Sequence, residues 1–194
     1  MDAMSLKCAQ ELSDAHVDVM GYACLVAIMS MGRGYHCVSE VNLHQETVAN
    51  DFPTPIVTSA GALINGLKVL GAKQISIITP YMRPLTDMVV DYIENQGIKV
   101  KQSIALEIPD NLEVAAQNPM NLLEIYKQLD LTDVDVLVAS ACVQMPSLEA
   151  IDLIQAECGI PVTSAAVCTT YEMMKKLNIE PKSAIGGELL SGKY

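Results

Sequence analysis

The sequence predicts an α/β fold of two pseudo-symmetric lobes, each with a mainly parallel sheet flanked by helices. Apolar strand-like runs alternate with helical runs along the 194 residues, which is typical of a parallel sheet with helical crossovers. Two features also recur in the same order: an apolar run ending in Ala-Cys, at 17–24 and 134–142, and a later Val-Thr-Ser-Ala, at 57–60 and 162–165. The recurrence indicates a duplicated α/β unit.

The first part of the chain contains five predicted elements. Residues 3–14 form a helical pattern, residues 16–23 a buried strand, and residues 25–32 a helix-prone stretch that ends at a glycine. A short strand follows at 54–60. The helix predicted at 61–71 also closes at a glycine, the usual residue at a helix end.

The rest of the chain repeats the alternation. The helix predicted at 118–130 begins with Asn118 as a cap and Pro119 at the first helical position. Strands are predicted at 73–80, 98–106, 134–142 and 160–166, and helices at 85–97, 118–130, 146–159 and 168–178.

The repeat also predicts how the chain divides. We expect residues 1–71 plus 178–194 to form the first lobe and residues 72–177 the second. A full β-α-β-α stretch precedes the second cysteine strand, whereas a single helix precedes the first. If the lobes are equivalent, the first is N-terminally truncated, and its sheet has an exposed edge.

Composition excludes several functional classes. The chain is 51% hydrophobic and 18% charged, as expected of a globular domain, and its net charge of −11 repels nucleic-acid backbones. The absence of tryptophan argues against a base-stacking platform. No stretch resembles a signal peptide, and the longest apolar run is too short to cross a bilayer. We therefore expect a cytoplasmic protein that binds neither nucleic acid nor membranes.

The six cysteines fall into two groups. None forms a CxxC pair, and no histidine stands at zinc-like spacing from them, so no metal site is expected. Two cysteines, Cys24 and Cys142, occupy matching ends of the repeated strands. The others are expected to be free thiols that pack as small hydrophobic side chains: Cys8, Cys37, Cys158 and Cys168.

The matched cysteines predict a catalytic pair. Ligands of parallel α/β folds bind beyond the carboxyl ends of strands, where helix N-termini stabilise a thiolate or a substrate carboxylate. Pseudo-symmetry would bring Cys24 and Cys142 to opposite walls of one cleft. Such a pair suits attack or proton transfer on both faces of a small diacid.

Other polar residues give weaker indications. The Tyr81 hydroxyl follows a strand end and could bind a carboxylate, although an exposed loop tyrosine is an equal alternative. Asn111 lies in a predicted loop, where a turn role is common. Ser59 and Ser164, in the repeated Thr-Ser-Ala turns, could line the cleft or cap the helices that follow, and we expect capping.

Four segments carry a resemblance to a known family. "GYACLVAIMSMGRGYH", "TPYMRPLTDMVVDYI", "IPDNLEV" and "ASACVQMPSL" resemble, in this order, the maleate cis-trans isomerases of the Asp/Glu racemase superfamily. The resemblance covers essentially the whole chain. It implies an Asp/Glu racemase-like fold, no metal or organic cofactor, a homo-oligomer of two or more copies, and a role in aromatic catabolism.

The resemblance also implies roles for individual residues. Cys24 would add to C2 of maleate, rotation about C2–C3 would follow, and Cys142 would move a proton at C3. Tyr81 and Asn111 match positions that bind substrate carboxylates. Backbone amides near the two cysteines would contribute as well, at Leu25, Val26, Val143 and Gln144. Relatives open with a strand ending in a Ser-Asn-Thr type motif, which has no match here.

Three alternatives stay open. A two-cysteine aspartate, glutamate or hydantoin racemase would usually have polar residues after each cysteine, whereas Leu-Val and Val-Gln follow here. Arylmalonate decarboxylases typically work with one such cysteine, and two are present. An inactive, truncated binding remnant of the fold is the third alternative.

Overall fold

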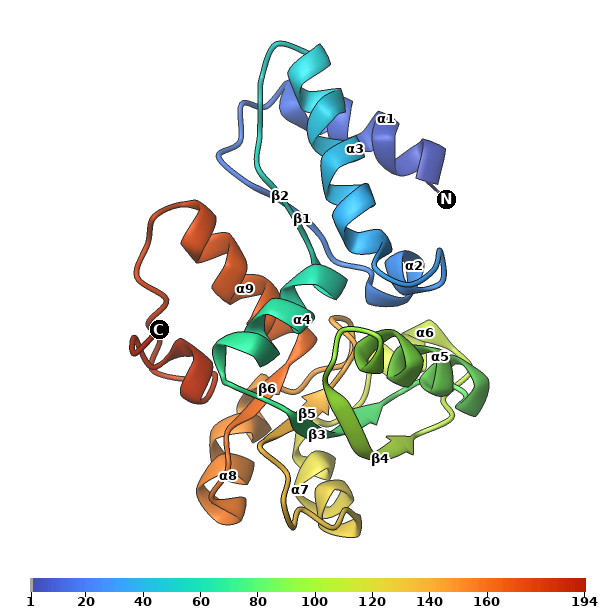
Figure 1. Cartoon of the computed structure of the whole chain (residues 1–194), viewed down its shortest axis with the longest axis vertical. Coiled ribbons are helices and arrows are strands. Elements are labelled where there is room, and N and C mark those ends of the chain that lie inside the picture. Colours follow the sequence, from blue (N-terminus) through green and yellow to red (C-terminus); the bar gives the residue numbers. More distant parts are fainter. Residues whose placement is uncertain (1) are drawn as a thin grey trace.

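The computed structural model describes residues 2–194, and within them it forms two parallel sheets (Figure 1). The smaller sheet pairs β1 (Met20–Tyr22) with β2 (Ile56–Thr58). The larger has the order β4-β3-β5-β6, with β3 at Gln74–Thr79, β4 at Lys99–Ala105, β5 at Val136–Ser140 and β6 at Val162–Ser164. The predicted α/β class with parallel sheets is confirmed.

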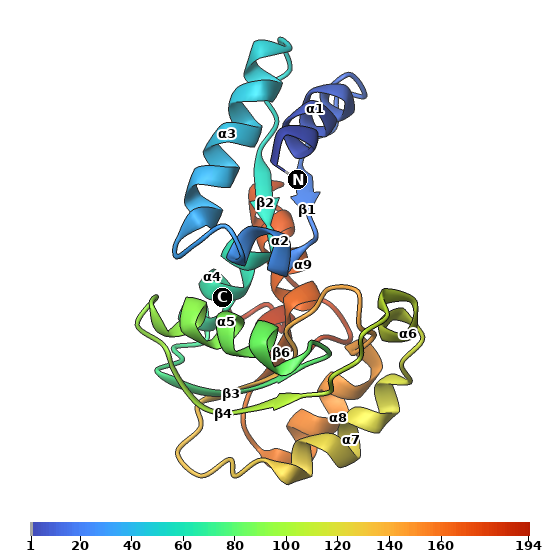
Figure 2. The same cartoon turned by 90° about the vertical axis from the view of Figure 1, so that its right-hand side faces the viewer.

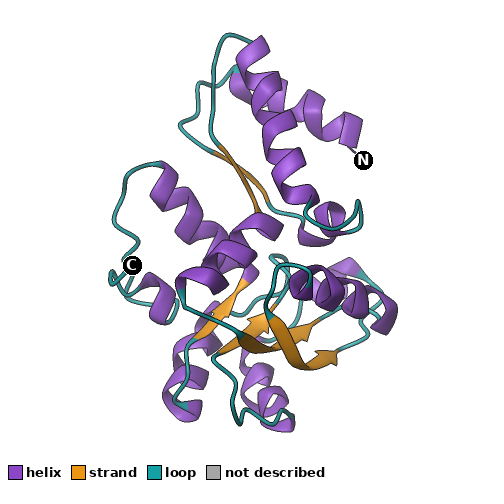
Figure 3. Cartoon of the chain, in the orientation of Figure 1, coloured by secondary structure: helices purple, strands orange, loops and turns teal. Residues whose placement is uncertain are grey.

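Helices pack against both sheets (Figure 3). The first four are α1 (Asp2–Ser13), α2 (Leu25–Met29), α3 (Tyr35–Ala49) and α4 (Ser59–Val69). The later ones are α5 (Arg83–Glu94), α6 (Asn111–Ala115), α7 (Leu122–Ile125), α8 (Leu148–Cys158) and α9 (Ala165–Lys176). Short 3-10 turns are η1 (Pro119–Asn121), η2 (Tyr126–Gln128) and η3 (Glu188–Leu190).

Several predicted elements differ in extent. The helix expected at 118–130 is instead η1, α7 and η2 in succession, although the Asn118 side chain does cap it by accepting a hydrogen bond from the Met120 amide. The strand expected at 16–23 is confined to β1. Helix α3 was not predicted, because its buried face includes His36, Ser39 and Thr47 and so lacks an apolar period.

The repeated Val-Thr-Ser-Ala segments start two helices that pack on each other. The Ser164 hydroxyl caps α9 by accepting a hydrogen bond from the Val167 amide, as predicted. Ser59 does not cap α4, because that helix begins at Ser59 itself, two residues before the predicted start at residue 61. Thr58 takes the cap position and accepts from the Gly61 amide. Helices α4 and α9 lie against each other at the centre of the molecule.

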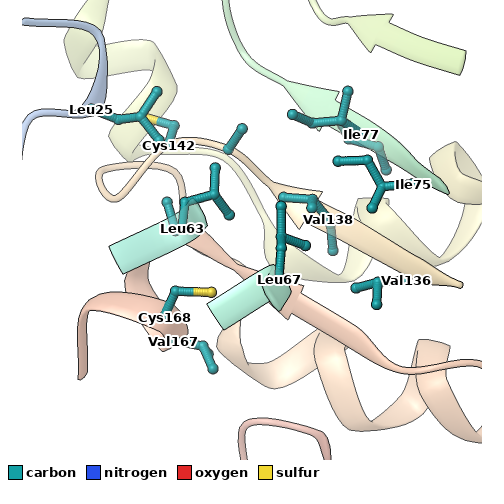
Figure 4. Close-up of a cluster of buried hydrophobic side chains, with 14 of the residues drawn as sticks. Leu25, Leu63, Leu67, Ile75, Ile77, Val136, Val138, Cys142, Val167 and Cys168 are labelled. Atoms are coloured by element: carbon teal, nitrogen blue, oxygen red, sulfur yellow. The ribbon is translucent and has the colours of Figure 1, made fainter. Parts of the chain in front are cut away.

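A close approach between Gly66 and Cys168 joins these helices. Leu63 and Leu67 of α4 lie beside Cys168 of α9 in the core (Figure 4). The Cys168 thiol contacts the Thr163 hydroxyl at 3.3 Å, and burial raises the pKa of this thiol to about 12. Cys168 is therefore a packing residue, as predicted.

The other cysteines expected to pack as hydrophobic side chains differ from that expectation. Cys8 and Cys37 are exposed, and Cys158 is half-buried. Cys8 lies on the outer helix α1 and Cys37 in the first turn of α3, so neither side chain reaches the core.

We expect Gly66→Ala to destabilise the protein. A Cβ atom at this position would lie 2.6 Å from Cys168 Sγ and 3.1 Å from Leu189 Cδ2, both inside contact distance. The overpacking should lower the free energy of unfolding by about 1–3 kcal/mol in urea titrations. The double variant Gly66→Ala/Cys168→Ala removes the clashing sulfur, so its loss should be smaller than the sum of the single losses. Additive losses would contradict this account.

The segment after α9 folds back onto the larger sheet. The Asp152 carboxylate of α8 accepts hydrogen bonds from the Gly186 and Gly187 amides, and Gln155 Oε1 accepts from the Glu188 amide. These contacts join residues 186–188 to α8. The predicted division, with residues 1–71 plus 178–194 in the first lobe and 72–177 in the second, stays a prediction.

The smaller sheet lies beneath α1 and α3 (Figure 2). Among the described strands, β1 pairs with β2 alone. An apolar groove of about 310 Å³ runs along β1, lined by side chains that include Met4 and Leu12 of α1 and Leu43 of α3. Across residues 2–194, no helix combines the length and apolarity needed to cross a membrane.

Candidate active site

One cavity contains every residue that the sequence singled out for the site. It has a volume of about 120 Å³ and lies where the turn after β1 meets the carboxyl ends of β3 and β5 and the start of α6. Its lining is Ala23, Cys24, Leu25, Val26, Tyr81, Asn111, Val114, Cys142, Val143 and Gln144. The two matched strand ends therefore open onto a common space.

Cys24 stands at the junction of β1 and α2. Its backbone is extended, with φ −125° and ψ 91°, and it occupies the cap position of α2. Its side chain is exposed, whereas Leu25, Ile28 and Met29 are buried. These apolar side chains anchor α2 in the core and so fix the position from which the Cys24 thiol projects.

Cys142 occupies the matching position after β5 and is buried. The Ser140 hydroxyl holds this turn locally: it donates to the Cys142 carbonyl at 2.9 Å and accepts from the Cys142 amide at 3.3 Å. Cys142 lies beside Leu25, across the boundary between the two sheets (Figure 4). Ser140 was not predicted, although a serine that ends an otherwise apolar strand was a usable signal.

Tyr81 follows β3 and is half-buried rather than a free loop side chain. Its hydroxyl donates a hydrogen bond to the Ala141 carbonyl at 3.1 Å. Burial raises the pKa of Tyr81 far above its usual value, and the Cys142 and Cys24 thiols raise it further. The hydroxyl therefore stays protonated and remains a hydrogen-bond donor. It is also close enough to Cys142 and Cys24 for their charge state to affect its pKa.

Asn111 and Gln144 form the side of the cavity next to α6. Asn111 is the first residue of α6 rather than a loop residue, because the Asp110 side chain caps this helix by accepting from the Leu112 amide at 2.6 Å. Gln144 Nε2 donates to the Asn111 carbonyl at 2.8 Å. Gln144 was predicted for its backbone amide, so this side-chain contact is an addition.

The cavity has no cluster suited to a metal ion. Its side chains supply two thiols, a phenol and two amides, with no carboxylate or imidazole. No group of three or more His, Cys, Asp or Glu residues within 2–194 is arranged to hold a metal.

Comparison with known proteins identifies the family. The arylmalonate decarboxylase family model matches residues 5–190. A maleate isomerase from Geobacillus stearothermophilus is 55% identical over 194 residues, covering 100% of this chain and 77% of that protein. The chain belongs to the maleate isomerase family. The resemblance predicted from the sequence is confirmed.

Solved structures of maleate isomerases share the fold in detail. The enzyme Iso from Pseudomonas putida S16, as a cysteine-to-alanine variant with maleate, has a TM-score of 0.98 and 57% identity, covering 100% of this chain and 77% of that one. The Nocardia farcinica enzyme, as a cysteine-to-serine variant with a covalently bound succinylcysteine intermediate, has a TM-score of 0.95 and 38% identity. That match covers 100% of this chain and 79% of the other. Covalent cysteine chemistry therefore occurs in this maleate isomerase family.

Proposed function

We propose that this chain isomerises maleate to fumarate through a covalent adduct on Cys24. The observation that carries the proposal is the convergence of Cys24 and Cys142 on one small cavity, in a chain of the maleate isomerase family. The cavity volume, about 120 Å³, is well below the roughly 300–1,000 Å³ of drug-sized ligand pockets. A four-carbon diacid is a ligand of suitable size.

The proposed reaction begins with addition. The Cys24 thiolate forms a bond to C2 of maleate, the C2–C3 π electrons move to C3, and C3 takes a proton from the Cys142 thiol. The product is a succinyl adduct with a C2–C3 single bond. Covalent catalysis thereby replaces hindered rotation about a double bond with rotation about a single bond.

Elimination completes the cycle. After rotation, the Cys142 thiolate removes a proton from C3, the double bond re-forms, and the C2–S bond breaks. Fumarate leaves, Cys24 returns as the thiolate and Cys142 as the thiol. Every proton and electron pair is restored, so the reaction as written requires no external oxidant or reductant. The mainly apolar walls, including Leu25, Val26 and Val114, would limit access of water to the adduct.

Carboxylate recognition is assigned to polar groups around the thiols. The protonated Tyr81 hydroxyl can exchange its contact with the Ala141 carbonyl for a substrate carboxylate. The Asn111 side chain and the backbone amides beside the cysteines, at Leu25, Val26, Val143 and Gln144, supply further donors around the same cavity. These donors are uncharged, so they can bind the two carboxylates of maleate without placing a fixed positive charge beside C2 and C3.

A turnover assay tests the proposed function. Purified protein is mixed with maleate, and fumarate is followed by ultraviolet absorbance and chromatography, while parallel samples receive D- or L-aspartate. We expect fumarate from maleate and no interconversion of the aspartate enantiomers. Racemisation without fumarate formation would replace this proposal with the racemase alternative.

We expect Tyr81→Phe to weaken maleate binding. A hydrogen bond to a charged group contributes about 1.5–3 kcal/mol, so KM should rise roughly 10- to 100-fold. The matched control is Tyr171→Phe, which removes the hydroxyl of a buried tyrosine on α9, outside the cavity. Steady-state kinetics at varied maleate check both variants. An unchanged KM in Tyr81→Phe would remove Tyr81 from substrate binding.

Location and assembly are part of the same proposal. A thiolate nucleophile must stay reduced, which favours the cytoplasm. We also propose a homo-oligomer of two or more copies, supported by exposed apolar side chains along α3 at Val38, Val41 and Val48. The native mass measured by light scattering gives the number of copies.

A further inference from the structure

The start of α3 is bound to α5 by a buried contact that the proposed chemistry does not use. His36 lies in the first turn of α3, and Tyr92 lies in the last turn of α5. Both side chains are buried, with exposed fractions of 7% and 1%. The two residues are 56 positions apart in sequence, so this contact forms only when α3 and α5 come together in the folded chain.

Tyr92 supplies the cap that α3 lacks locally. The cap position of α3 is Gly34, which has no side chain to accept a hydrogen bond, and its φ of 72° suits glycine. The first amides of a helix have no acceptor within the helix. The Tyr92 hydroxyl accepts from the His36 amide at 3.1 Å and therefore fills this role from another helix.

The same hydroxyl also contacts the His36 ring. Its oxygen lies 2.5 Å from Nδ1. Burial lowers the pKa of His36, while Glu40 raises it and Lys68 lowers it. A neutral imidazole accepts a hydrogen bond from the hydroxyl at Nδ1, so the Tyr92 hydroxyl donates one hydrogen bond and accepts one. The Tyr92 hydroxyl and the His36 Nδ1 then each have a hydrogen-bond partner within the interior.

A second contact between the same segments is exposed. Arg33 Nε donates to Asp91 Oδ2 at 3.0 Å, and a second guanidinium nitrogen pairs with Oδ1. Both side chains are more than half exposed, so this pair contributes little by itself. It provides a surface control for the buried pair.

The buried pair joins two helices, α3 and α5, that both contact α2. Helix α2 begins directly after Cys24 and packs against α3, α4 and α5, and Figures 1 and 2 both show it between α3 and α5. At the other end, α5 begins two residues after Tyr81, and the Thr86 hydroxyl of α5 donates to the Tyr81 carbonyl at 3.4 Å. The contact therefore links the Cys24 wall to the Tyr81 wall.

One turn further along α3, a second side chain fixes the other neighbour. Glu40 accepts hydrogen bonds from the Thr58 amide at 3.0 Å and the Thr58 hydroxyl at 2.8 Å. Thr58 is the cap of α4. Glu40 thus holds α3 against the start of α4, and His36 holds α3 against α5. Because α2 packs against all three helices, these two contacts fix the position of α2.

We propose that His36 and Tyr92 are positioning residues that set the Cys24 thiol against Tyr81 and Cys142 across the cavity. The inference rests on the proposed function for its kinetic consequence, but the geometry it describes can be measured without substrate. The side-chain donors to the carboxylates, Tyr81 and Asn111, do not lie on α2, whereas Cys24 and the backbone donors Leu25 and Val26 adjoin or lie on it, so loss of the pair should impair attack by Cys24 more than binding.

The kinetic experiment compares Tyr92→Phe with Tyr171→Phe. Both remove the hydroxyl of a buried tyrosine. Because small misplacements of reacting groups cost large factors in rate, we expect kcat of Tyr92→Phe to fall on the order of tenfold while KM stays within about twofold. Tyr171→Phe and the surface variant Arg33→Gln should keep the wild-type kcat. A purely structural role would lower the melting temperature without this split between kcat and KM.

Substitutions of His36 test the same contact from its other partner. They keep the proposal testable if Tyr92→Phe does not fold. In His36→Asn the amide oxygen can take the place of Nδ1 as acceptor, whereas His36→Leu has no acceptor. We expect His36→Asn to retain most of the wild-type kcat and His36→Leu to match Tyr92→Phe. Equal kcat values in the two His36 variants would overturn the proposal.

The substrate-free experiment measures alkylation of Cys24 by iodoacetamide, with Cys8 in the same molecule as the reference. Peptide mass spectrometry gives the ratio of the two rates. Thiol reactivity depends on the local environment, so we expect the ratio to change by about threefold or more in Tyr92→Phe and His36→Leu. It should not change in Tyr171→Phe.

The two readouts separate the two proposals. A shifted alkylation ratio in a protein without maleate turnover would uphold the positioning role and overturn the proposed function. Maleate turnover with both kcat and the ratio unchanged in Tyr92→Phe would uphold the function and overturn the positioning role.

Discussion

Replacing Cys24 with alanine is expected to abolish maleate turnover, with a loss on the order of 10³-fold or more, as for removal of other catalytic nucleophiles. No other side chain lining the cavity on the α2 side carries a nucleophilic atom, because its neighbours are Ala23, Leu25 and Val26. Without the sulfur the C2–C3 double bond stays intact, and rotation about it is blocked. Fumarate formation at saturating maleate gives the measurement.

The matched control for this prediction is Cys8→Ala. Cys8 is also an exposed thiol, but it lies on α1 beside the apolar groove and not on the cavity. We expect wild-type turnover and wild-type melting temperature in this variant. Equal turnover in Cys8→Ala and Cys24→Ala would remove Cys24 from the mechanism.

The second large effect is expected at Cys142. General acid–base catalysis contributes about 10²–10⁴-fold, so Cys142→Ser should lower kcat by a factor in that range. A serine hydroxyl occupies a similar volume but is a far weaker acid than a thiol, so it exchanges the C3 proton slowly. KM should change little, because the proposed carboxylate donors remain in place.

Cys158→Ser is the control for the serine substitution. Cys158 is half-buried at the end of α8, and its sulfur lies 3.7 Å from the Ile160 carbonyl, a contact that a serine hydroxyl can maintain. This variant should turn over maleate at the wild-type rate. A Cys142→Ser variant as fast as Cys158→Ser would show that Cys142 moves no proton in the rate-limiting step.

The site was predictable because its signal was local. Cys24 and Cys142 each follow a strand in the same Ala-Cys context, and ligands of parallel α/β folds bind beyond such carboxyl ends; β1 and β5 belong to different sheets, and both ends open onto the cavity. Tyr81 follows β3 by the same rule. The structure brings these residues to one cavity, while their catalytic and binding roles stay predictions.

The features that the sequence did not predict depend on long-range contacts. Helix α3 buries His36, Ser39 and Thr47, so hydrophobic periodicity could not reveal it. Its cap comes from Tyr92, a residue on another helix, and no local motif predicts such a pairing. Similarly, the side chain of Gln144 reaches the Asn111 carbonyl only because α6 folds over the cavity.

The start of α4 differs from the prediction because two adjacent hydroxyl residues, Thr58 and Ser59, could each cap this helix. Thr58 rather than Ser59 caps α4, since its hydroxyl accepts from the Gly61 amide and also donates to Glu40 of α3. Ser59 is then carried into the first turn, where its hydroxyl is buried without a partner among the described residues. The hydrogen bond from Thr58 to Glu40 of α3 therefore favours Thr58 over Ser59 as the cap of α4.

Mass spectrometry of Cys142→Ser protein incubated with maleate tests the central claim most directly. Attack by Cys24 should proceed in this variant with a proton taken from solvent, while elimination is slowed, so the succinyl adduct should accumulate. We predict a mass increase equal to one molecule of maleic acid, located on the peptide that contains Cys24. An unmodified protein, or an adduct confined to any other cysteine, would contradict the account.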